Sequence, residues 1–150
     1  MDDLTKEQRH AVMSKIRSRD TKPEILLRKA LWRQGIRYRK NFKGLPGKPD
    51  IAITRYHIAV FVDGEYFHGR GWEDGKKEKA EAGANASYWV PKIERNIKRD
   101  DGVDALLKGM GWTVIRFWSR DVLKDVDSCV NVINDCIFSQ KTAEENQDMS

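Results

Sequence analysis

Asp50 is the first residue whose position suggests chemistry. It follows Lys48 and Pro49 and opens a short apolar segment, although aspartate is depleted in strands. One interpretation is a metal ligand held at the end of a strand, because Mg²⁺ prefers carboxylate oxygens. The other is a turn aspartate that bonds to its own loop backbone. Both interpretations fit the local sequence.

A second group of polar residues, Asp63, Glu65 and His68, follows the most apolar run of the chain. A hairpin turn over residues 54–57 places this group beside Asp50. Neighbouring carboxylates repel each other, and Mg²⁺ removes that repulsion while it keeps several waters. One aspartate and a backbone carbonyl can therefore suffice as protein ligands. His68 can serve as a general base or acid near neutral pH, and an ordinary core or surface histidine is the alternative.

Asp100 interrupts the apolar face of a predicted long helix. The rest of that face carries hydrophobic side chains at helical spacing, namely Ile93, Ile97, Val103, Leu107 and Met110. A buried carboxylate must be paired or hydrogen-bonded. His68 is one candidate partner, and the resulting Asp–His pair would orient the imidazole. Arg95, Arg99 and Arg116 are the alternative partners, in a purely structural ion pair.

Two further features have both a structural and a functional interpretation. Thr21 and Glu24 have the spacing of a capping box at a helix start, while a helix N-terminus can also bind a phosphate. Tyr66 and Phe67 are adjacent aromatics beside a predicted loop. They fit stacking on or wedging between DNA bases, and ordinary packing at a strand end is the alternative.

Hydrophobic periodicity and turn residues predict the elements that position these groups. Helices are expected over 5–18, 21–35, 88–108 and 125–138, and strands over 37–42, 50–54, 57–62 and 112–118. A crossover by the long helix favours parallel third and fourth strands. The prediction is an α/β fold with a small mixed sheet flanked by helices, in a single domain over 1–140. Residues 69–87 are expected to form a flexible loop, and residues 141–150 a polar disordered tail.

Composition excludes several classes of protein. The chain has 150 residues, of which 39% are hydrophobic and 34% charged, and its apolar runs are too short to span a membrane. The N-terminal residues lack the pattern of a secretory signal, so a cytoplasmic location is expected. Cys129 and Cys136 are about 10 Å apart along a helix at the usual rise, too far for a disulfide. Both are interpreted as buried small hydrophobes.

The net charge of +5 is distributed unevenly. Residues 15–43 hold eleven Lys or Arg and two acids, whereas residues 121–150 hold two basic residues and seven acids. The basic half indicates a polyanionic partner, and a solvated basic face is the alternative.

Five segments, in order and with similar spacing, resemble the very short patch repair endonucleases. They are Met13–Glu24, Leu45–Asp50, Phe61–His68, Trp89–Asp100 and Gly111–Trp112, so the resemblance runs from about residue 9 to 125. It implies a restriction-endonuclease-like fold. It also implies Mg²⁺-assisted hydrolysis of a phosphodiester in double-stranded DNA, on the 5′ side of the T of a G·T mismatch.

The resemblance also implies roles for single residues. Asp50 matches the metal-binding aspartate, and Val62 matches a residue whose backbone carbonyl binds metal, while Asp63 is a further candidate ligand suggested by its position. His68 matches the catalytic histidine, Asp100 the acid paired with it, and Glu24 a catalytic or metal-water glutamate.

For DNA binding, Tyr66 and Phe67 match an aromatic wedge inserted from the major groove, and Met13 matches a wedge residue on the opposite side. The remaining candidates are basic side chains that can hold phosphates, namely Lys15, Arg17, Arg19 and Lys48.

The family commonly holds a structural zinc through cysteines and histidines. The matching positions here are Glu65, Arg70, Trp72 and Arg120, which cannot reproduce a tetrahedral thiolate and imidazole site. No structural zinc is expected, and an ion pair between Glu65 and Arg120 is predicted to replace part of that link.

Three functions therefore compete. The first is a nicking endonuclease for G·T mismatches, acting as a monomer and paired functionally with a cytosine methyltransferase. The second keeps the chemistry but acts on another DNA structure or a specific sequence, as homing or restriction-type nucleases do. The third is a DNA-binding module without catalysis.

Overall fold

The computed structural model describes residues 20–65, 68–83 and 85–148. The helix predicted over 5–18 lies outside this part of the chain. So do six of the expected DNA-binding residues, namely Met13, Lys15, Arg17, Arg19, Tyr66 and Phe67.

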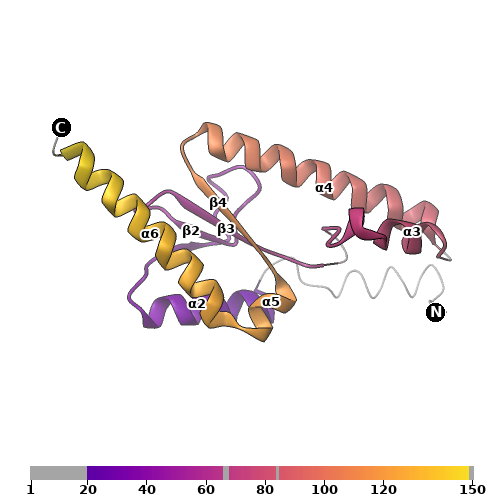
Figure 1. Cartoon of the computed structure of the whole chain (residues 1–150), viewed down its shortest axis with the longest axis horizontal. Helices are drawn as coiled ribbons and strands as arrows, with labels where there is room; N and C mark the ends of the chain where they lie inside the picture. Colours follow the sequence, from indigo (N-terminus) through magenta and orange to yellow (C-terminus); the bar gives the residue numbers. More distant parts are fainter. Residues whose placement is uncertain (1–19, 66–67, 84, 149–150) are drawn as a thin grey trace.

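A four-stranded mixed sheet forms the centre of the molecule (Figure 1). Its strands are β1 (Arg39–Lys40), β2 (Ile51–Ile53), β3 (Ile58–Asp63) and β4 (Thr113–Trp118), and they lie in that order. β1 pairs with β2 and β2 with β3 in antiparallel fashion. β3 and β4 are parallel, as the crossover predicts.

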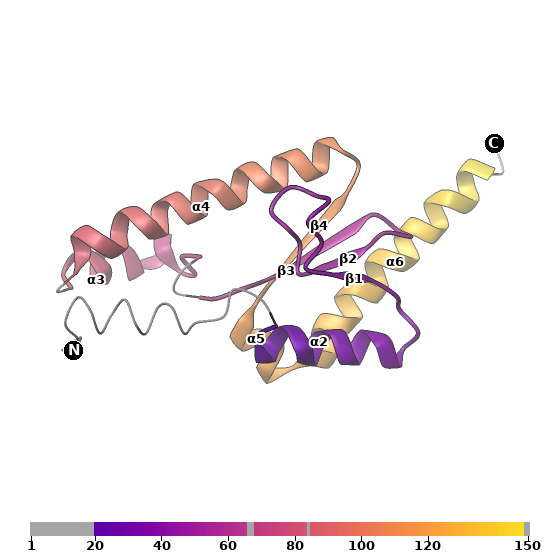
Figure 2. The same cartoon turned by 180° about the vertical axis from the view of Figure 1, so that it is seen from behind.

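Helices cover both faces of the sheet (Figures 1 and 2). α4 (Ala86–Gly109) covers one face. α2 (Lys22–Arg33), α5 (Ser119–Lys124) and α6 (Val126–Asp148) cover the other. This mixed α/β architecture is that of a restriction-endonuclease-like fold.

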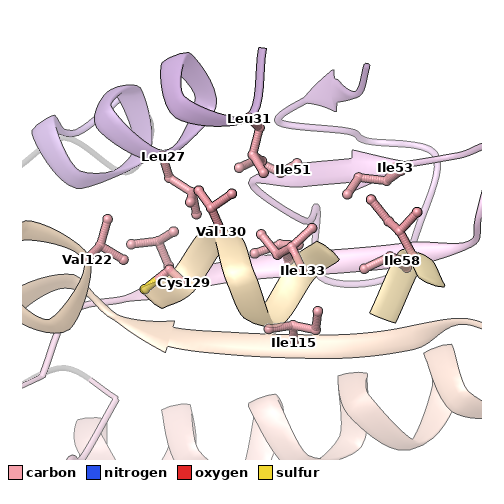
Figure 3. Packing of buried hydrophobic residues seen from close by; sticks show 13 residues of the cluster. Leu27, Leu31, Ile51, Ile53, Ile58, Ile115, Val122, Cys129, Val130 and Ile133 are labelled. Atoms are coloured by element: carbon pink, nitrogen blue, oxygen red, sulfur yellow. The ribbon is translucent and has the colours of Figure 1, made fainter. Parts of the chain in front are cut away.

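Alternation along β3 explains how one strand serves two cores. Ile58, Val60 and Val62 pack against Leu27 and Leu31 of α2 and the apolar side of α6 (Figure 3), because successive side chains of a strand point to opposite faces. Ala59 and Phe61 therefore face α4, where they join a second cluster with Leu107. All six residues of β3 are buried, as its near-continuous apolar sequence predicts. Asp63 continues the face of Phe61 and thus points toward α4.

Two differences from the predicted elements have physical reasons. β1 is shorter than residues 37–42 because Asn41 takes a left-handed φ of 48° that ends the strand. Residues 69–87 are not a simple loop, because they contain the 3₁₀ helix η1 (Trp72–Asp74) and α3 (Lys76–Glu81). α3 is tied to α4 by an ion pair of 2.9 Å between Lys77 and Glu94, a contact between residues distant in sequence.

The C-terminal helix is also longer than predicted, since residues 141–148 continue α6 rather than forming a disordered tail. Good helix formers such as Ala143, Glu144 and Glu145 lie there. The Gln140 amide donates to the Thr113 hydroxyl at 3.2 Å, which anchors this part of the helix to the sheet. α5 was not predicted, because six residues are too few for a recognisable period.

Three further sequence predictions concern the cysteines, Met110 and membrane crossing. Cys129 is buried and Cys136 is half-buried, and both are free thiols. The prediction that Met110 belongs to the apolar face of α4 is wrong, because Met110 follows the last residue of the helix and is 53% exposed. Within the described residues, no helix has the length and apolar character needed to cross a bilayer.

Candidate active site

Asp50 and Val62 are joined across two strands. Because β2 and β3 are antiparallel, the start of β2 lies beside the end of β3. The Val62 N–H donates to an Asp50 carboxylate oxygen at 2.7 Å. Asp50 is thereby fixed at the end of the sheet.

The carbonyl of Val62 faces the same edge as its N–H, because both groups of a strand residue point to one side of an antiparallel ladder. The pairing of Ile51 with Val60 places Pro49 opposite Val62 when the register is extended. Proline has no N–H to donate. In this register the residue opposite Val62 is Pro49, so the Val62 carbonyl oxygen lacks the backbone N–H that would normally donate to it. This oxygen lies on the side of β3 that faces Asp50.

Glu24 lies at the start of α2 and is only 3% exposed. Its carboxylate accepts hydrogen bonds from the Asp20 N–H at 2.9 Å and the Thr21 hydroxyl at 3.1 Å. Thr21 is the N-cap residue, but its side chain makes no capping bond. The predicted capping box is therefore wrong in detail. The Glu24 carboxylate accepts from the backbone N–H of Asp20, one residue before the cap, and the Thr21 hydroxyl donates to Glu24 instead of capping the helix.

His68 and Asp100 form the pair that the sequence proposes. His68 Nδ1 lies 2.6 Å from Asp100 Oδ2. A carboxylate accepts hydrogen bonds, so this contact favours the tautomer in which Nδ1 carries the proton and Nε2 is the acceptor nitrogen of the neutral ring. Burial alone would lower the pKa of His68, but the hydrogen bond to Asp100 and the charge of Asp63 outweigh it and raise the pKa above 6.5.

Gly69 allows His68 to reach this helix. It has a left-handed φ of 71°, and a Cβ at this position would collide with the Ile97 side chain. Ile97 lies one turn before Asp100 on α4, so the close approach of Gly69 to α4 brings the neighbouring His68 onto the carboxylate. Glycine is the one residue that meets both requirements without strain.

Asp63 belongs to a cluster of charged residues with Arg116, Asp104, Asp100 and His68, which the sequence pattern did not predict. Arg116 donates to Asp63 at 3.0 and 3.2 Å and to Asp104 at 2.7 to 3.2 Å, and it lies 3.8 Å from Asp100. Asp63 also lies 3.8 Å from His68 Nδ1. Asp63, His68 and Asp100 are close enough together to hold a cation, but Arg116 already neutralises Asp63 there.

The same ion cluster lines a cavity of about 190 Å³ between α4 and the ends of β3 and β4. Its walls include Asp101, Phe117 and Trp118. The Arg116 guanidinium stacks on the Phe61 ring, with its central carbon 4.1 Å from the ring centroid. Arg95 and Arg99, the other partners considered for Asp100, are exposed on α4.

Asp50 has a different electrostatic environment. Burial, together with the negative charges of Glu24 and Asp63, raises the pKa of Asp50 to about 7, against the opposing Val62 hydrogen bond. Burial also raises the pKa of Glu24. Within the described residues, no Lys or Arg forms an ion pair with Asp50. The Asp50 carboxylate is thus a partly buried negative charge in need of a cation or a proton.

Three of the four positions that match the family's zinc ligands, Glu65, Arg70 and Arg120, belong to a polar network. The Glu65 carboxylate accepts the Arg120 backbone N–H at 2.6 Å, so the predicted pairing with the Arg120 side chain is wrong and the amide takes its place. Arg70 lies 3.8 Å from Glu65 and 3.1 Å from Asp121. This Glu65–Arg70–Asp121 network links the segment that carries His68 to the start of α5.

Lys48 is exposed in a tight turn closed by its N–H to the Leu45 carbonyl at 3.2 Å, with a left-handed φ of 49°. Sequence reasoning missed two charged residues, Arg28 and Asp104, and considered Arg116 only as a partner of Asp100. One signal was available for Arg28, which lies four residues after Glu24 on the buried side of α2. Asp104 has the same spacing from Asp100 on α4.

Known proteins resemble this chain over most of its length. A family model described as DNA mismatch endonuclease Vsr matches residues 1–74. The type II nicking enzyme V.NmeDIP of Neisseria meningitidis serogroup C is 48% identical over 137 residues, covering 91% of this chain and 90% of that protein. The type II nicking enzyme V.HpaIIP of Haemophilus parainfluenzae is 42% identical over 141 residues, covering 93% and 98%.

The DNA mismatch endonuclease Vsr of Escherichia coli strain K12 is 30% identical over 106 residues, covering 71% of this chain and 65% of that protein. The similarity thus extends across the sheet, α4 and the residues that meet at the candidate site. The chain belongs to the Vsr family of DNA mismatch endonucleases and is a hydrolytic DNA endonuclease.

Proposed function

We propose that this endonuclease nicks double-stranded DNA on the 5′ side of the T of a G·T mismatch, with Mg²⁺ bound by Asp50 and the Val62 carbonyl. The observation that carries the proposal is the His68–Asp100 hydrogen bond of 2.6 Å, together with a partly buried Asp50 carboxylate that forms no ion pair with a Lys or Arg among the described residues. An acid–base group and a metal ligand are the two components that hydrolysis of a phosphodiester needs.

The donor set at Asp50 fits Mg²⁺. It offers one carboxylate oxygen and one carbonyl oxygen, and Mg²⁺ binds few protein ligands because it retains several waters. The nearby charges of Glu24 and Asp63 raise the pKa of Asp50 and equally favour a bound cation. When bound, Mg²⁺ would stabilise the charge that develops on the phosphate during cleavage. Asp63 is a weaker candidate ligand, since Arg116 occupies both of its oxygens.

The protein's own groups would manage the protons. His68 presents Nε2 to the phosphodiester while Asp100 holds Nδ1–H, which fixes the tautomer and stabilises the imidazolium that forms when Nε2 accepts a proton. Glu24, with its carboxylate fixed by Asp20 and Thr21, would orient a water next to Asp50.

A basic and aromatic face of α4 supports DNA binding near this site. It carries Tyr88, Lys92, Arg95 and Arg99, each about one turn from the next, along a shallow groove of about 690 Å³. Lys48 adds an exposed cation at the turn before Asp50. Phosphate contacts of this kind make the affinity fall steeply with salt concentration. Action as a monomer and functional pairing with a cytosine methyltransferase are parts of the same proposal.

The substrate has a second candidate, because the relatives at 48% and 42% identity are named type II nicking enzymes. A nuclease that recognises a specific sequence or another DNA structure would keep the same chemistry. The DNA-binding module without catalysis is set aside, because the chain belongs to an endonuclease family.

A nicking assay separates the two candidates. The duplexes differ at one position only, which holds a G·T mismatch, a matched G·C pair or another mismatch, and each is prepared in several flanking sequences. Each duplex is incubated with Mg²⁺ or with a chelator. We expect Mg²⁺-dependent cleavage of one strand on the G·T duplex alone. Equal cutting of G·T and G·C duplexes would support the second candidate and reject mismatch recognition.

A further inference from the structure

Arg28 is a buried cation to which the proposed cleavage mechanism assigns no role. It lies on the inner side of α2 and is 8% exposed. Its Nη2 donates to Asp20 Oδ1 at 2.9 Å, and the Tyr38 hydroxyl donates to its backbone carbonyl at 3.0 Å. Its Nη1 is buried and has no hydrogen-bond partner among the described residues. A buried unsatisfied guanidinium nitrogen is costly, so it calls for an explanation.

The Glu24 carboxylate is close to this nitrogen, with Oε2 3.8 Å from Arg28 Nη1. That distance is too long for a hydrogen bond but short enough for strong attraction inside a buried site. A small movement of the Glu24 carboxylate would complete the bond. Arg28 is therefore placed to hold Glu24 charged and to limit where its carboxylate can go.

Arg28 also acts on Glu24 through the backbone. Asp20 has a left-handed φ of 56°, a conformation that costs energy for a residue other than glycine. This conformation directs the Asp20 N–H to Glu24. The hydrogen bond from Arg28 to the Asp20 carboxylate helps to keep Asp20 in this conformation.

The same network reaches Asp50. Asn41 Nδ2 donates to Asp20 Oδ1 at 3.3 Å, and the Asn41 N–H donates to the Asp50 carbonyl at 3.0 Å. The start of α2 and the start of β2 are thus connected through the carboxylate that Arg28 binds.

We propose that Arg28 is a positioning residue for the cleavage reaction, which acts by fixing the Glu24 carboxylate next to Asp50 through a direct contact and through Asp20. The inference rests on the proposed function, in which Glu24 orients water at the metal site. It assigns Arg28 no contact with DNA, because its side chain is buried between α2 and the sheet.

The test is a double-mutant cycle between Arg28→Met and Glu24→Gln. Nicking of a G·T duplex with Mg²⁺ gives kcat and KM, and fluorescence anisotropy with Ca²⁺ in place of Mg²⁺ gives DNA affinity without cleavage. Arg28→Met is expected to lower kcat about 10²-fold, since a displacement of about 1 Å in a catalytic group can cost that much. KM and DNA affinity should stay within about threefold. In the Glu24→Gln background, Arg28→Met should change kcat by less than about twofold.

Conservative and control variants complete the design. Arg28→Lys keeps the charge but cannot bridge two carboxylates with a planar fork, so it should restore part of kcat. Lys124→Met removes an exposed cation and should leave kcat and KM unchanged. Asp20→Asn keeps the side-chain size and is used if Arg28→Met does not fold; its loss of kcat should likewise vanish in the Glu24→Gln background.

Each outcome has one meaning. An equal loss of kcat in both backgrounds would overturn the inference and make Arg28 a general structural residue. A loss confined to KM and DNA affinity would also overturn it. If Glu24→Gln alone nicks at the normal rate, the proposed role of Glu24 fails, and the role of Arg28 fails with it.

Discussion

His68 Nδ1 lies 2.6 Å from Asp100 Oδ2, although the two residues come from a loop and a helix 32 positions apart in the chain. The contact favours a proton on Nδ1 and makes Nε2 the acceptor nitrogen of the neutral ring. Asp63 and Arg116 adjoin the pair without replacing either partner.

Replacing Asp100 with asparagine tests this pair. An amide can donate to Nδ1 and so favours the wrong imidazole tautomer, and it removes the charge that stabilises imidazolium. We expect kcat to fall about 10²–10⁴-fold, the usual contribution of general acid–base catalysis. The pKa of His68, measured by NMR titration of the imidazole, should fall from above 6.5. An unchanged pKa and rate would show that Asp100 is only structural.

The His68–Asp100 pair also predicts a pH dependence of stability. The pKa of His68 is raised in the folded protein, so the folded state binds the proton more tightly than the unfolded state. Its stabilisation is fully present below pH 6.5 and is lost as pH rises through the folded pKa. Thermal unfolding of wild type and Asp100→Asn should therefore differ most at pH 6 and least well above the folded pKa. A constant difference across this range would contradict the charge pairing.

Asp50→Asn should separate activity from stability. The asparagine side-chain oxygen can still accept the Val62 N–H, but it cannot bind a metal as a carboxylate does. Nicking should be abolished while DNA affinity in Ca²⁺-free buffer stays nearly normal. Because the pKa of Asp50 is raised to about 7, the charged carboxylate destabilises the metal-free protein at higher pH. The variant should accordingly unfold a few degrees higher than wild type at pH 8 with chelator, by calorimetry.

Metal affinity should itself depend on pH. Below about pH 7 a metal ion must displace a proton from Asp50, so affinity should rise about tenfold per pH unit and level off above pH 7. Isothermal titration with Mn²⁺, another cation that suits oxygen ligands, measures this without DNA. A flat profile between pH 6 and 8 would place the metal on other ligands.

The Glu65–Arg70–Asp121 network leads to a prediction about zinc. Prolonged chelation should leave the unfolding temperature of the protein unchanged, because ion pairs and the Arg120 amide hold this region together. Arg70→Met should lower that temperature by about 2–4 °C, since a partly exposed pair contributes about 1 kcal/mol or less. Bound zinc by elemental analysis, with a large loss of stability on chelation, would contradict this.

The sequence alone was enough for the type of fold, and it nominated the candidate site residues. Apolar alternation and helical spacing are local properties, so the sheet strands, α2, α4 and the parallel pairing of β3 with β4 could be predicted. Asp100 could be singled out for the same reason, because a charge on an apolar stripe violates a local pattern. The motifs that resemble the Vsr family then joined Asp50, His68 and Glu24 into one hypothesis.

Tertiary structure decided the features that depend on residues distant in sequence. α3 and the last turns of α6 have weak periodicity and are held by contacts with α4 and the sheet. The Arg116 cluster and the link from Glu65 to the Arg120 amide have no local signature. The spacing of Arg28 from Glu24 is a local signal, but it does not show that Arg28 also binds Asp20. The raised pKa of Asp50 likewise follows from burial and from neighbouring charges. These properties arise only when the folded chain excludes water and brings charges within a few ångströms of one another, which spacing along a sequence does not encode.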